Sequence, residues 1–433
     1  MSDPAVMPIR RAGLLVATLG DEVVVHDPAA SRSWRLNRTA GIILDRCDGR
    51  TDVAQVVTEL AAAFGVDPGQ VGRQVTTALG SFAADGLVPG PDGDDAAPPG
   101  RTGTARGGPD ETPGGEDRTD APSRSGGRTW RRALDVAVSV ESDEPRCAAE
   151  VERVFGSLPT DVGGEAAGGP ATRLAYRLRV DDGATIDIQL DGRSVGGANS
   201  VAAALSYAQW HLNQEVIAHS SDRALLHAGA VRRPGGGLVV LPGQTNAGKS
   251  TLTAGLVRAG WGYLTDELVG ITPGTGEAGG YRKALSLDPG AWPLFPEAAP
   301  ASTPTRTDAA PAEPAQPGAS PAPGPDGPTP GEWLVDPRAL HPDALDGPPQ
   351  GEVVLVVFPR FETGAVTAAE SLSPARALVE LLRHRVGGDP IDPAEFDTLV
   401  DLARRVPTFV LTTGGLSPAV ERVATLATPG AHP

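Results

Sequence analysis

The feature that most restricts the fold of this chain is an eight-residue motif, G-x-x-x-x-G-K-S, at residues 243–250. An apolar run at residues 238–241 precedes it and an amphipathic run follows, which is the strand, loop and helix order of a phosphate-binding loop. Small residues let successive backbone N–H groups surround a phosphate, and the helix N-terminus adds partial positive charge. The residues expected to bind nucleotide are Gly243, Gln244, Thr245, Asn246, Ala247, Gly248, Lys249, Ser250 and Thr251.

Lysine usage supports this interpretation. Of the 37 basic residues, lysine occurs only at Lys249 and Lys283, and all the others are arginine. The chain thus keeps a compact ammonium at the position where a phosphate site needs one. We expect Lys249 to reach the β- and γ-phosphates and the Ser250 hydroxyl to ligate Mg²⁺, so the predicted cofactors are ATP or GTP with Mg²⁺. A chance match in a chain with 55 glycines is the alternative.

Charge and cysteine content limit the partners. The formal net charge is −17, which argues against nucleic acid and anionic membranes as partners. Cys47 and Cys147 are the only cysteines, and they lack the spacing of a metal site or a disulfide framework. No apolar run approaches the roughly 20 residues of a membrane span, and the N-terminus lacks the apolar core of a signal peptide. We therefore expect a soluble, cytoplasmic protein, with homo-oligomerisation left open.

Two tracts, residues 89–129 and 296–332, contain no aliphatic or aromatic side chain larger than alanine. Such segments cannot bury a core, so both are predicted to be disordered. The first is expected to link a domain at residues 1–88 to a domain at residues 130–433, and the second to be an insert within the latter. A flexible linker as long as residues 89–129 spans roughly 35 Å. A peptide bound by the first domain would therefore be present at about millimolar concentration near the second domain.

The N-terminal region reads as three strands followed by three helices. Apolar runs at residues 14–19 and 23–26 flank a Gly20-Asp21 turn, and a third strand is expected at residues 33–36. Helices are expected from Ile42, after a cap at Thr51, and after a cap at Asp67. A core from Val53, Leu60, Phe64, Val75, Leu79 and Phe82 is predicted to let this winged-helix-like module fold alone.

Several short motifs in this region resemble the PqqD family over roughly residues 13–88. They are Leu36-Asn37, Thr39-Ala40, Ile43-Leu44, Cys47-Asp48-Gly49 and Gly86-Leu87-Val88. The resemblance implies a domain that binds the leader peptide of a ribosomally made, modified peptide, by adding it as a strand to the edge of the hairpin. A winged helix that binds DNA or docks within the chain is the alternative.

The C-terminal region alternates strands with helices, which predicts an α/β domain with a largely parallel sheet and the phosphate loop at the end of a strand. Expected strands are 130–140, 172–180, 185–190, 225–231, 261–271 (interrupted at Asp266-Glu267), 353–358 and 408–412. Expected helices are 202–218, 375–384, 396–404 and 418–427.

This region resembles the HPr kinase/phosphorylase family, and more closely the HPr-kinase-like proteins found beside peptide-modification systems. Three ordered segments carry the resemblance: residues 226–229 (LHAG), 243–250 and 260–267 (GWGYLTDE). It implies a P-loop kinase domain that phosphorylates serine. The chain departs from the family in having Asp266-Glu267 where relatives have two aspartates, and in lacking their downstream glycine-rich signature. HPr as the substrate and the reverse phosphorolysis therefore stay open.

The resemblance and the chemistry of phosphoryl transfer suggest four catalytic residues. Asp266 is the expected general base, while Glu267 is expected to hold Mg²⁺ through water or to exchange roles with Asp266. His227 matches the family's histidine near the phosphates. Lys283, together with Arg282, is expected to neutralise the transferring phosphoryl group. The alternatives are a polar strand end for the carboxylates and purely structural roles for the basic residues.

The sequence thus predicts a leader-peptide-binding domain fused to a nucleotide-dependent serine kinase that acts on a peptide or protein. Two alternatives keep the nucleotide site. The chain can be a nucleotide-switched chaperone that delivers peptide to another enzyme, or a small-molecule kinase with a vestigial N-terminal module.

Overall fold

The computed structural model describes residues 6–89, 128–161, 172–181, 185–220, 222–299, 333–428 and 430. Nearly all of the predicted linker and insert, residues 89–129 and 296–332, lies outside these described residues. Contacts divide the chain into two units, residues 1–128 and 129–433, which are described separately. None of the helices in the described ranges is long and apolar enough to cross a membrane.

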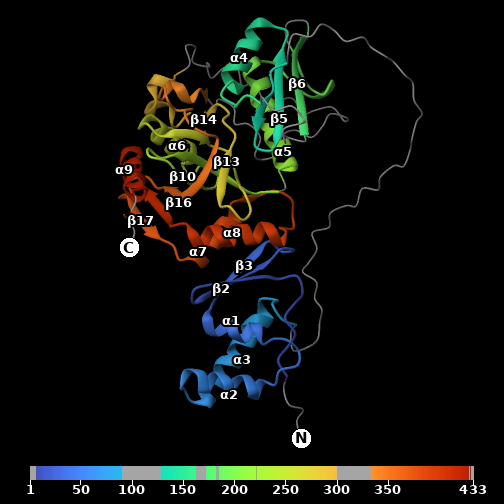
Figure 1. Cartoon of the computed structure of the whole chain (residues 1–433), viewed down its shortest axis with the longest axis vertical. Coiled ribbons are helices and arrows are strands. Elements are labelled where there is room, and N and C mark those ends of the chain that lie inside the picture. Colours follow the sequence, from blue (N-terminus) through green and yellow to red (C-terminus); the bar gives the residue numbers. More distant parts are fainter. Residues whose placement is uncertain are drawn as a thin grey trace, which may run out of the picture. The chain divides into compact units, whose positions relative to one another are not determined.

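The first unit contains a three-stranded antiparallel sheet followed by three helices (Figure 1). Strands β1 (Leu15–Leu19) and β2 (Glu22–Asp27) form a hairpin whose turn uses Gly20 at a φ of +65°. Strand β3 (Arg32–Asn37) pairs with β2, so β2 is central in the order β1-β2-β3. The predicted three strands are confirmed.

The predicted helices of this unit are also present, although the first begins four residues earlier than predicted and the second one residue later. They are α1 (Arg38–Asp45), α2 (Val53–Phe64) and α3 (Pro68–Ala84). Asn37 caps α1, and Asp52 rather than Thr51 caps α2, because the Asp52 carboxylate accepts from the N–H groups of Ala54 and Gln55. Asp67 caps α3 as predicted.

The core of this unit lies between the sheet and the three helices. It includes Val25, Ile43, Leu60, Val75 and Phe82, all of which are buried. Of the predicted core residues, Phe64 is 49% exposed. It is the last residue of α2, where Gly65 turns the chain away in a left-handed conformation, so its ring lies outside the packed interface.

The second unit begins with a five-stranded sheet in the order β4-β5-β6-β7-β8. The single strand expected at residues 130–140 is instead two strands that form a hairpin, because Leu134 takes a φ of +52° between them. Helix α5, which covers the predicted 202–218, crosses this sheet and packs on β7 and β8. The elements are β4 (Arg131–Ala133), β5 (Val136–Ser142), α4 (Pro145–Phe155), β6 (Thr172–Asp181), β7 (Thr185–Leu190), β8 (Arg193–Ala198) and α5 (Val201–His219).

A larger sheet carries the phosphate-loop motif. Among the described residues it has nine strands, with the main order β10-β9-β12-β13-β16-β19-β17 and with β11 and β18 paired to β9. The strands are β9 (Ala224–Arg232), β10 (Leu238–Pro242), β11 (Gly262–Thr265), β12 (Leu268–Ile271), β13 (Glu277–Gly280), β16 (Gln350–Phe361), β17 (Ala368–Ser371), β18 (Arg385–Val386) and β19 (Thr408–Thr413).

The prediction of a largely parallel sheet is wrong. Among the described strands of this sheet, only the β10–β16 and β16–β19 pairs are parallel. The connections explain the difference, because a short turn can join only antiparallel neighbours. Residues 233–237 link β9 directly to β10, with Gly235, Gly236 and Gly237 all at positive φ. Strand β19 follows β16 through two helices, which gives that pair room to run parallel.

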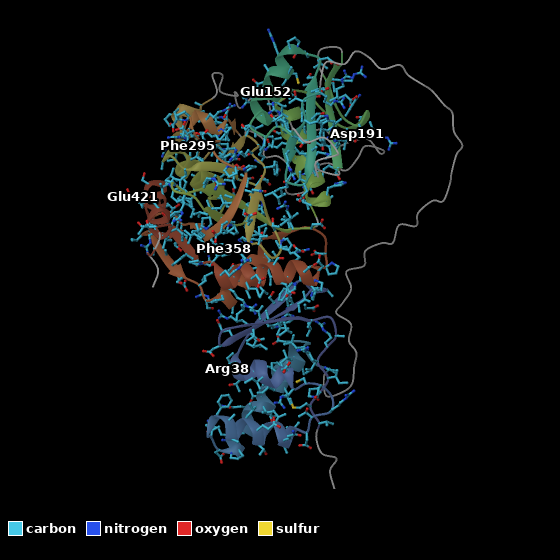
Figure 2. The ribbon with its side chains drawn as sticks, viewed as in Figure 1. Arg38, Glu152, Asp191, Phe295, Phe358 and Glu421 are labelled. Carbon is cyan, nitrogen blue, oxygen red and sulfur yellow. The ribbon has the colours of Figure 1, made fainter. Side chains whose placement is uncertain are left out.

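Helices α6 (Lys249–Arg258) and α9 (Leu416–Leu426) pack on each other and on this sheet. Their shared core includes Leu252, Val423 and the fully buried Phe295, which is labelled in Figure 2. Helices α7 (Pro374–Arg383) and α8 (Pro393–Arg405) form a second packed pair. A small ladder of β14 (Leu285–Leu287) with β15 (Trp333–Val335) completes the unit, beside 3₁₀ turns at Trp292–Leu294, Pro296–Ala298 and Pro337–Ala339.

Candidate functional site

The motif at residues 243–250 forms a loop between β10 and α6. Asn246 and Gly248 take φ values of +66° and +89°, so the loop bends sharply before the helix begins. A Cβ on Gly243 would lie 3.1 Å from Ala247 Cβ, which leaves little room for any larger residue. No side chain caps α6, so its first backbone N–H groups are available to a phosphate.

The Lys249 side chain is held against its own loop. Its Nζ donates to the Gln244 carbonyl at 3.0 Å, and the residue is only 6% exposed. Burial lowers the pKa of Lys249, while the charges of Glu267, Asp266 and Asp288 act in the opposite direction. Within the described ranges no carboxylate forms an ion pair with Lys249. The ammonium is therefore placed to pair with a bound anion.

Asp266 lies in the turn between β11 and β12 and is 2% exposed. Its Oδ1 accepts from Lys283 Nζ at 2.9 Å and from the Tyr263 hydroxyl at 3.0 Å, while its Oδ2 accepts from the Ser286 N–H at 2.9 Å. Burial would raise the pKa of this carboxyl, but the Lys283 charge and these hydrogen bonds outweigh it and lower the pKa. Asp266 therefore keeps its negative charge.

Glu267 has different surroundings from its neighbour. Its side chain is 31% exposed, and its oxygens lie 3.8 Å from Lys283 Nζ and 3.8 Å from His227 Nδ1. Both distances exceed hydrogen-bond length. The carboxylate therefore lies within reach of two basic groups without being fixed by either of them.

Lys283 follows β13 and is 1% exposed. Besides Asp266, its ammonium contacts the Ser286 hydroxyl at 3.3 Å and the Ala284 carbonyl at 3.3 Å. The adjacent Arg282 does not line the pocket, so no described contact supports a role for Arg282 on phosphate. Its guanidinium is occupied by backbone carbonyls of Tyr263, Leu345, Gly347 and Pro348.

His227 lies on β9, and its Nδ1 is 3.1 Å from the Glu267 carbonyl oxygen. Because a carbonyl only accepts, Nδ1 must carry the proton. Burial, followed by the charge of Lys249, lowers the pKa of His227, so the imidazole is neutral near pH 7. In this tautomer Nε2 is a hydrogen-bond acceptor, and it can donate to a phosphate oxygen only after taking up a proton.

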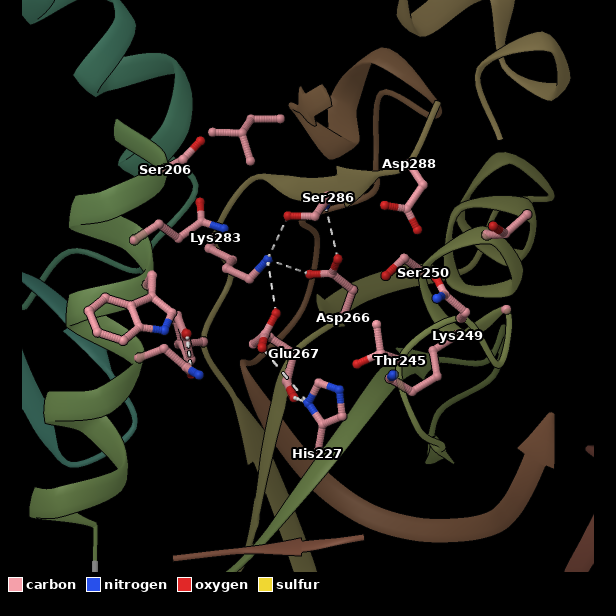
Figure 3. A pocket seen from close by; sticks show the side chains of 18 residues that line it. Ser206, His227, Thr245, Lys249, Ser250, Asp266, Glu267, Lys283, Ser286 and Asp288 are labelled. Atoms are coloured by element: carbon pink, nitrogen blue, oxygen red, sulfur yellow. Dashed lines mark hydrogen bonds and ion pairs between the residues drawn. The ribbon is translucent and has the colours of Figure 1, made fainter. Parts of the chain in front are cut away.

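One pocket brings most of the predicted residues together, as Figure 3 shows. Those in its lining are His227, Thr245, Asn246, Gly248, Lys249, Ser250, Thr251, Asp266, Glu267 and Lys283. Gly243, Gln244 and Ala247 shape the loop without lining the pocket. The carboxylates and Lys283 lie between the phosphate loop and the helix that carries Ser206 (Figure 3).

Eight lining residues were not predicted from the sequence: Ser206, Gln209, Trp210, Asn213, Tyr281, Ser286, Asp288 and Leu334. The four from α5 have the spacing i, i+3, i+4 and i+7, which is the signature of one helix face. That stripe of polar and aromatic residues was visible in the sequence. The sequence did not show that this face meets the phosphate loop.

The oxygen-rich lining fits Mg²⁺. The Ser250 hydroxyl and the carboxylates of Asp266, Glu267 and Asp288 line the same pocket, and Mg²⁺ prefers oxygen ligands. Across the described residues, no three His, Cys, Asp or Glu side chains group closely enough to hold a metal by themselves. An ion here would need phosphate oxygens or water to complete its shell, as is usual for Mg²⁺ with nucleotides.

In the first unit, the two outer strands of the sheet are candidates for peptide binding. In the described residues, β1 and β3 each pair only with β2 within their sheet. An outer strand presents unpaired N–H and C=O groups to which an extended segment can add.

Comparison with known proteins supports the assignment of this unit. No curated protein matches the chain. Among solved structures, "TbiB1 in Complex with the TbiA(beta) Leader Peptide" matches with 21% identity and a TM-score of 0.18, over 19% of this chain and 95% of that one. Residues 22–88 match the profile of the family described as coenzyme PQQ synthesis protein D (PqqD). The predicted resemblance is confirmed there, and residues 22–88 form a PqqD-type domain.

Proposed function

We propose that this chain is a nucleotide-dependent kinase that phosphorylates a serine of a peptide recruited by its PqqD-type domain. One observation carries the proposal. Among the described residues, the Lys249 ammonium forms no ion pair with a carboxylate. It lines the same pocket as a second buried ammonium, that of Lys283, and as the carboxylate of Glu267. Phosphoryl transfer requires positive charge around the phosphates and a proton acceptor near the attacking hydroxyl.

The loop side of the pocket would hold the nucleotide. Backbone N–H groups of residues 243–250 and the first turn of α6 would surround the β-phosphate, and Lys249 would exchange its contact with Gln244 for phosphate oxygens. Ser250 and Asp288 would hold Mg²⁺. That ion would neutralise charge on the β- and γ-phosphates.

The transfer step would take place beside Lys283. The oxygen of the acceptor hydroxyl forms a bond to the γ-phosphorus while the bond to the β,γ-bridging oxygen breaks, and the nucleoside diphosphate leaves. Lys283 would stabilise the negative charge on the transferring group. The hydroxyl proton would pass to a carboxylate.

We assign that proton to Glu267 and a positioning role to Asp266, which is the exchange of roles that the sequence left open. Asp266 has a lowered pKa and already receives three hydrogen bonds, so it is a weak proton acceptor that instead fixes Lys283. Glu267 is partly exposed and has no contact within hydrogen-bond length from Lys283 or His227. Its carboxylate is free to approach a substrate hydroxyl.

The PqqD-type domain would supply the acceptor. The resemblance to PqqD implies binding of a leader peptide, and the outer strands of its sheet offer backbone groups for an added strand. The direct test is transfer of label from γ-³²P-ATP or γ-³²P-GTP to a serine-containing precursor peptide that the PqqD-type domain binds. Labelled peptide would support the kinase. Tight nucleotide and peptide binding without label would contradict it and favour a nucleotide-switched chaperone.

Lys249→Met should weaken nucleotide binding by roughly 10- to 100-fold, because it removes a charge-assisted contact to the phosphates. The melting temperature of the nucleotide-free chain should stay equal or rise, since the buried ammonium has no carboxylate ion-pair partner to lose in the described part of the chain. Calorimetric titration with Mg²⁺-nucleotide measures the affinity. Arg404→Met removes the same charge from an exposed position on α8 and serves as the control. Equal affinity in both variants would rule out the phosphate site.

Residues 1–88 expressed alone should unfold cooperatively and bind the precursor peptide without nucleotide. The core around Val25, Ile43 and Phe82 belongs entirely to this unit, so folding does not need the rest of the chain. Thermal melting and fluorescence anisotropy of a labelled peptide give the two readouts. If only residues 129–433 bind the peptide, the role assigned to the PqqD-type domain is wrong.

A further inference from the structure

We infer that one face of α5 is the acceptor subsite of the pocket and that it binds an uncharged stretch of peptide backbone next to the phosphorylated residue. We call this face the α5 wall; it consists of Ser206, Gln209, Trp210 and Asn213. The inference rests on the proposed function, since it names the part of the pocket that holds the substrate.

The position of the α5 wall suits an acceptor. Its residues repeat at i, i+3, i+4 and i+7, so they share one face of the helix. Figure 3 shows Ser206 on the opposite side of the pocket from Lys249, with Lys283 and Asp266 between them. A γ-phosphate bound by Lys249 would face Lys283, and a group on the α5 wall would approach it from the other side. In-line transfer needs donor and acceptor in that arrangement.

Gln209 carries a buried acceptor that has no partner among the described residues. The residue is 8% exposed, and its Oε1 is buried without a hydrogen-bond partner in the described part of the chain. Buried amide oxygens are nearly always paired, because an unpaired one loses its hydration without compensation. Gln209 also lines the pocket, so a rotation of its amide would bring this oxygen to an N–H or O–H of a bound molecule.

Asn213 provides the complementary group. Its Oδ1 accepts from the buried Tyr281 hydroxyl at 2.7 Å, which fixes the amide and leaves Nδ2 to donate. Gln209 and Asn213 are four residues apart and lie one turn apart on the same face. One acceptor and one donor at this spacing match the N–H and C=O groups of a peptide backbone. The α5 wall carries no charged side chain, so it is not suited to phosphate or carboxylate groups.

A nucleobase is the competing occupant, because amides and a tryptophan can also recognise adenine. The order of groups in the pocket argues against it. The phosphate loop binds one end of the nucleotide, and the Lys283–Asp266 pair separates that loop from the α5 wall (Figure 3). In a nucleotide, the base is joined through the ribose to the α-phosphate, at the end away from the γ-phosphate. A base on the α5 wall would instead have to lie on the γ-phosphate side of the phosphate chain.

The test compares Gln209→Leu with Gln214→Leu in the full chain. Gln214 lies on the same helix but is exposed, which makes it a matched control. Gln209→Leu should raise KM for the precursor peptide about tenfold, leave kcat less affected, and leave nucleotide affinity unchanged. Gln214→Leu should match the wild type in all three. An unchanged KM would overturn the subsite, and weakened nucleotide binding with unchanged KM would assign the α5 wall to the base.

A binding measurement separates this inference from the proposed kinase activity. The uncharged probe N-acetyl-Ala-Ser-Ala-methylamide is titrated into full-length protein carrying 5-fluorotryptophan, in the presence of a non-hydrolysable nucleotide. The Trp210 resonance in the ¹⁹F spectrum, assigned with Trp210→Phe, should shift in the wild type and Gln214→Leu but not in Gln209→Leu. A shift in a chain that transfers no phosphate would keep the subsite and reject the kinase. No shift up to the solubility limit of the probe would reject the subsite.

Discussion

Glu267→Gln should lower the rate of phosphoryl transfer by about 10²- to 10⁴-fold, the usual loss when a general base is removed. The amide keeps the size of the side chain but cannot take the hydroxyl proton. Because the Glu267 side chain is partly exposed and its contacts with Lys283 and His227 are 3.8 Å long, the substitution breaks no short hydrogen bond to either of them. Stability and nucleotide affinity should therefore change little. Single-turnover kinetics with radiolabelled nucleotide and the precursor peptide measure the rate.

The matched control is Glu277→Gln, which removes a carboxylate from an exposed position on β13. It should transfer phosphate at the wild-type rate. A Glu267→Gln chain that remains as active as this control would exclude Glu267 as the proton acceptor. If Lys249→Met still lowered nucleotide affinity, the nucleotide site would stand and the nucleotide-switched chaperone would be favoured.

The loop at residues 243–250 was the part of the candidate site that the sequence could predict. Its residues are contiguous, and the apolar runs on either side determine the strand and the helix. His227, Asp266 and Lys283 come from three separate segments, and the sequence suggested them through a family resemblance together with the chemistry of phosphoryl transfer. The structure places all three in the same pocket lining.

Two features depended on long-range packing and were missed. The direction of the strands was wrong because periodicity reveals a strand but not its neighbour, and the glycine turn at residues 233–237 was not recognised as a hairpin. The different surroundings of Asp266 and Glu267 could not be predicted either. They depend on Tyr263, Lys283 and Ser286, and only the folded chain brings the last two of these to Asp266.

Asp266→Asn should lower the free energy of unfolding by about 3–5 kcal/mol, the usual cost of removing one partner from a buried ion pair. Both side chains of the Asp266–Lys283 pair are 1% exposed, so the Lys283 ammonium would be left buried beside an uncharged amide. The Tyr263 hydroxyl and the Ser286 N–H donate to different oxygens of Asp266. Asparagine has only one acceptor oxygen, so one of these two hydrogen bonds would be lost. Urea unfolding measures the loss.

The pH dependence of stability provides a second readout. The folded-state pKa of Asp266 is lowered, so its stabilising contribution is present in full above the ordinary aspartate pKa of about 3.9 and is lost as the pH falls through the folded value. The wild type should therefore lose stability in that acid range more steeply than Asp266→Asn. If the free energy of unfolding falls equally steeply with pH in the two proteins, Asp266 is not held ionised by its neighbours.

A double-mutant cycle decides whether the loss comes from the ion pair. Lys283→Met alone should also destabilise the chain, because it leaves the Asp266 carboxylate buried without a counter-charge. Asp266→Asn combined with Lys283→Met removes both charges, so it should be more stable than the sum of the two single losses predicts by roughly 1–3 kcal/mol. The double variant should nevertheless transfer no phosphate, since Lys283 is absent from the pocket. Additive losses in stability would mean that the two side chains do not stabilise each other, and Asp266 could then no longer be assigned the role of positioning Lys283.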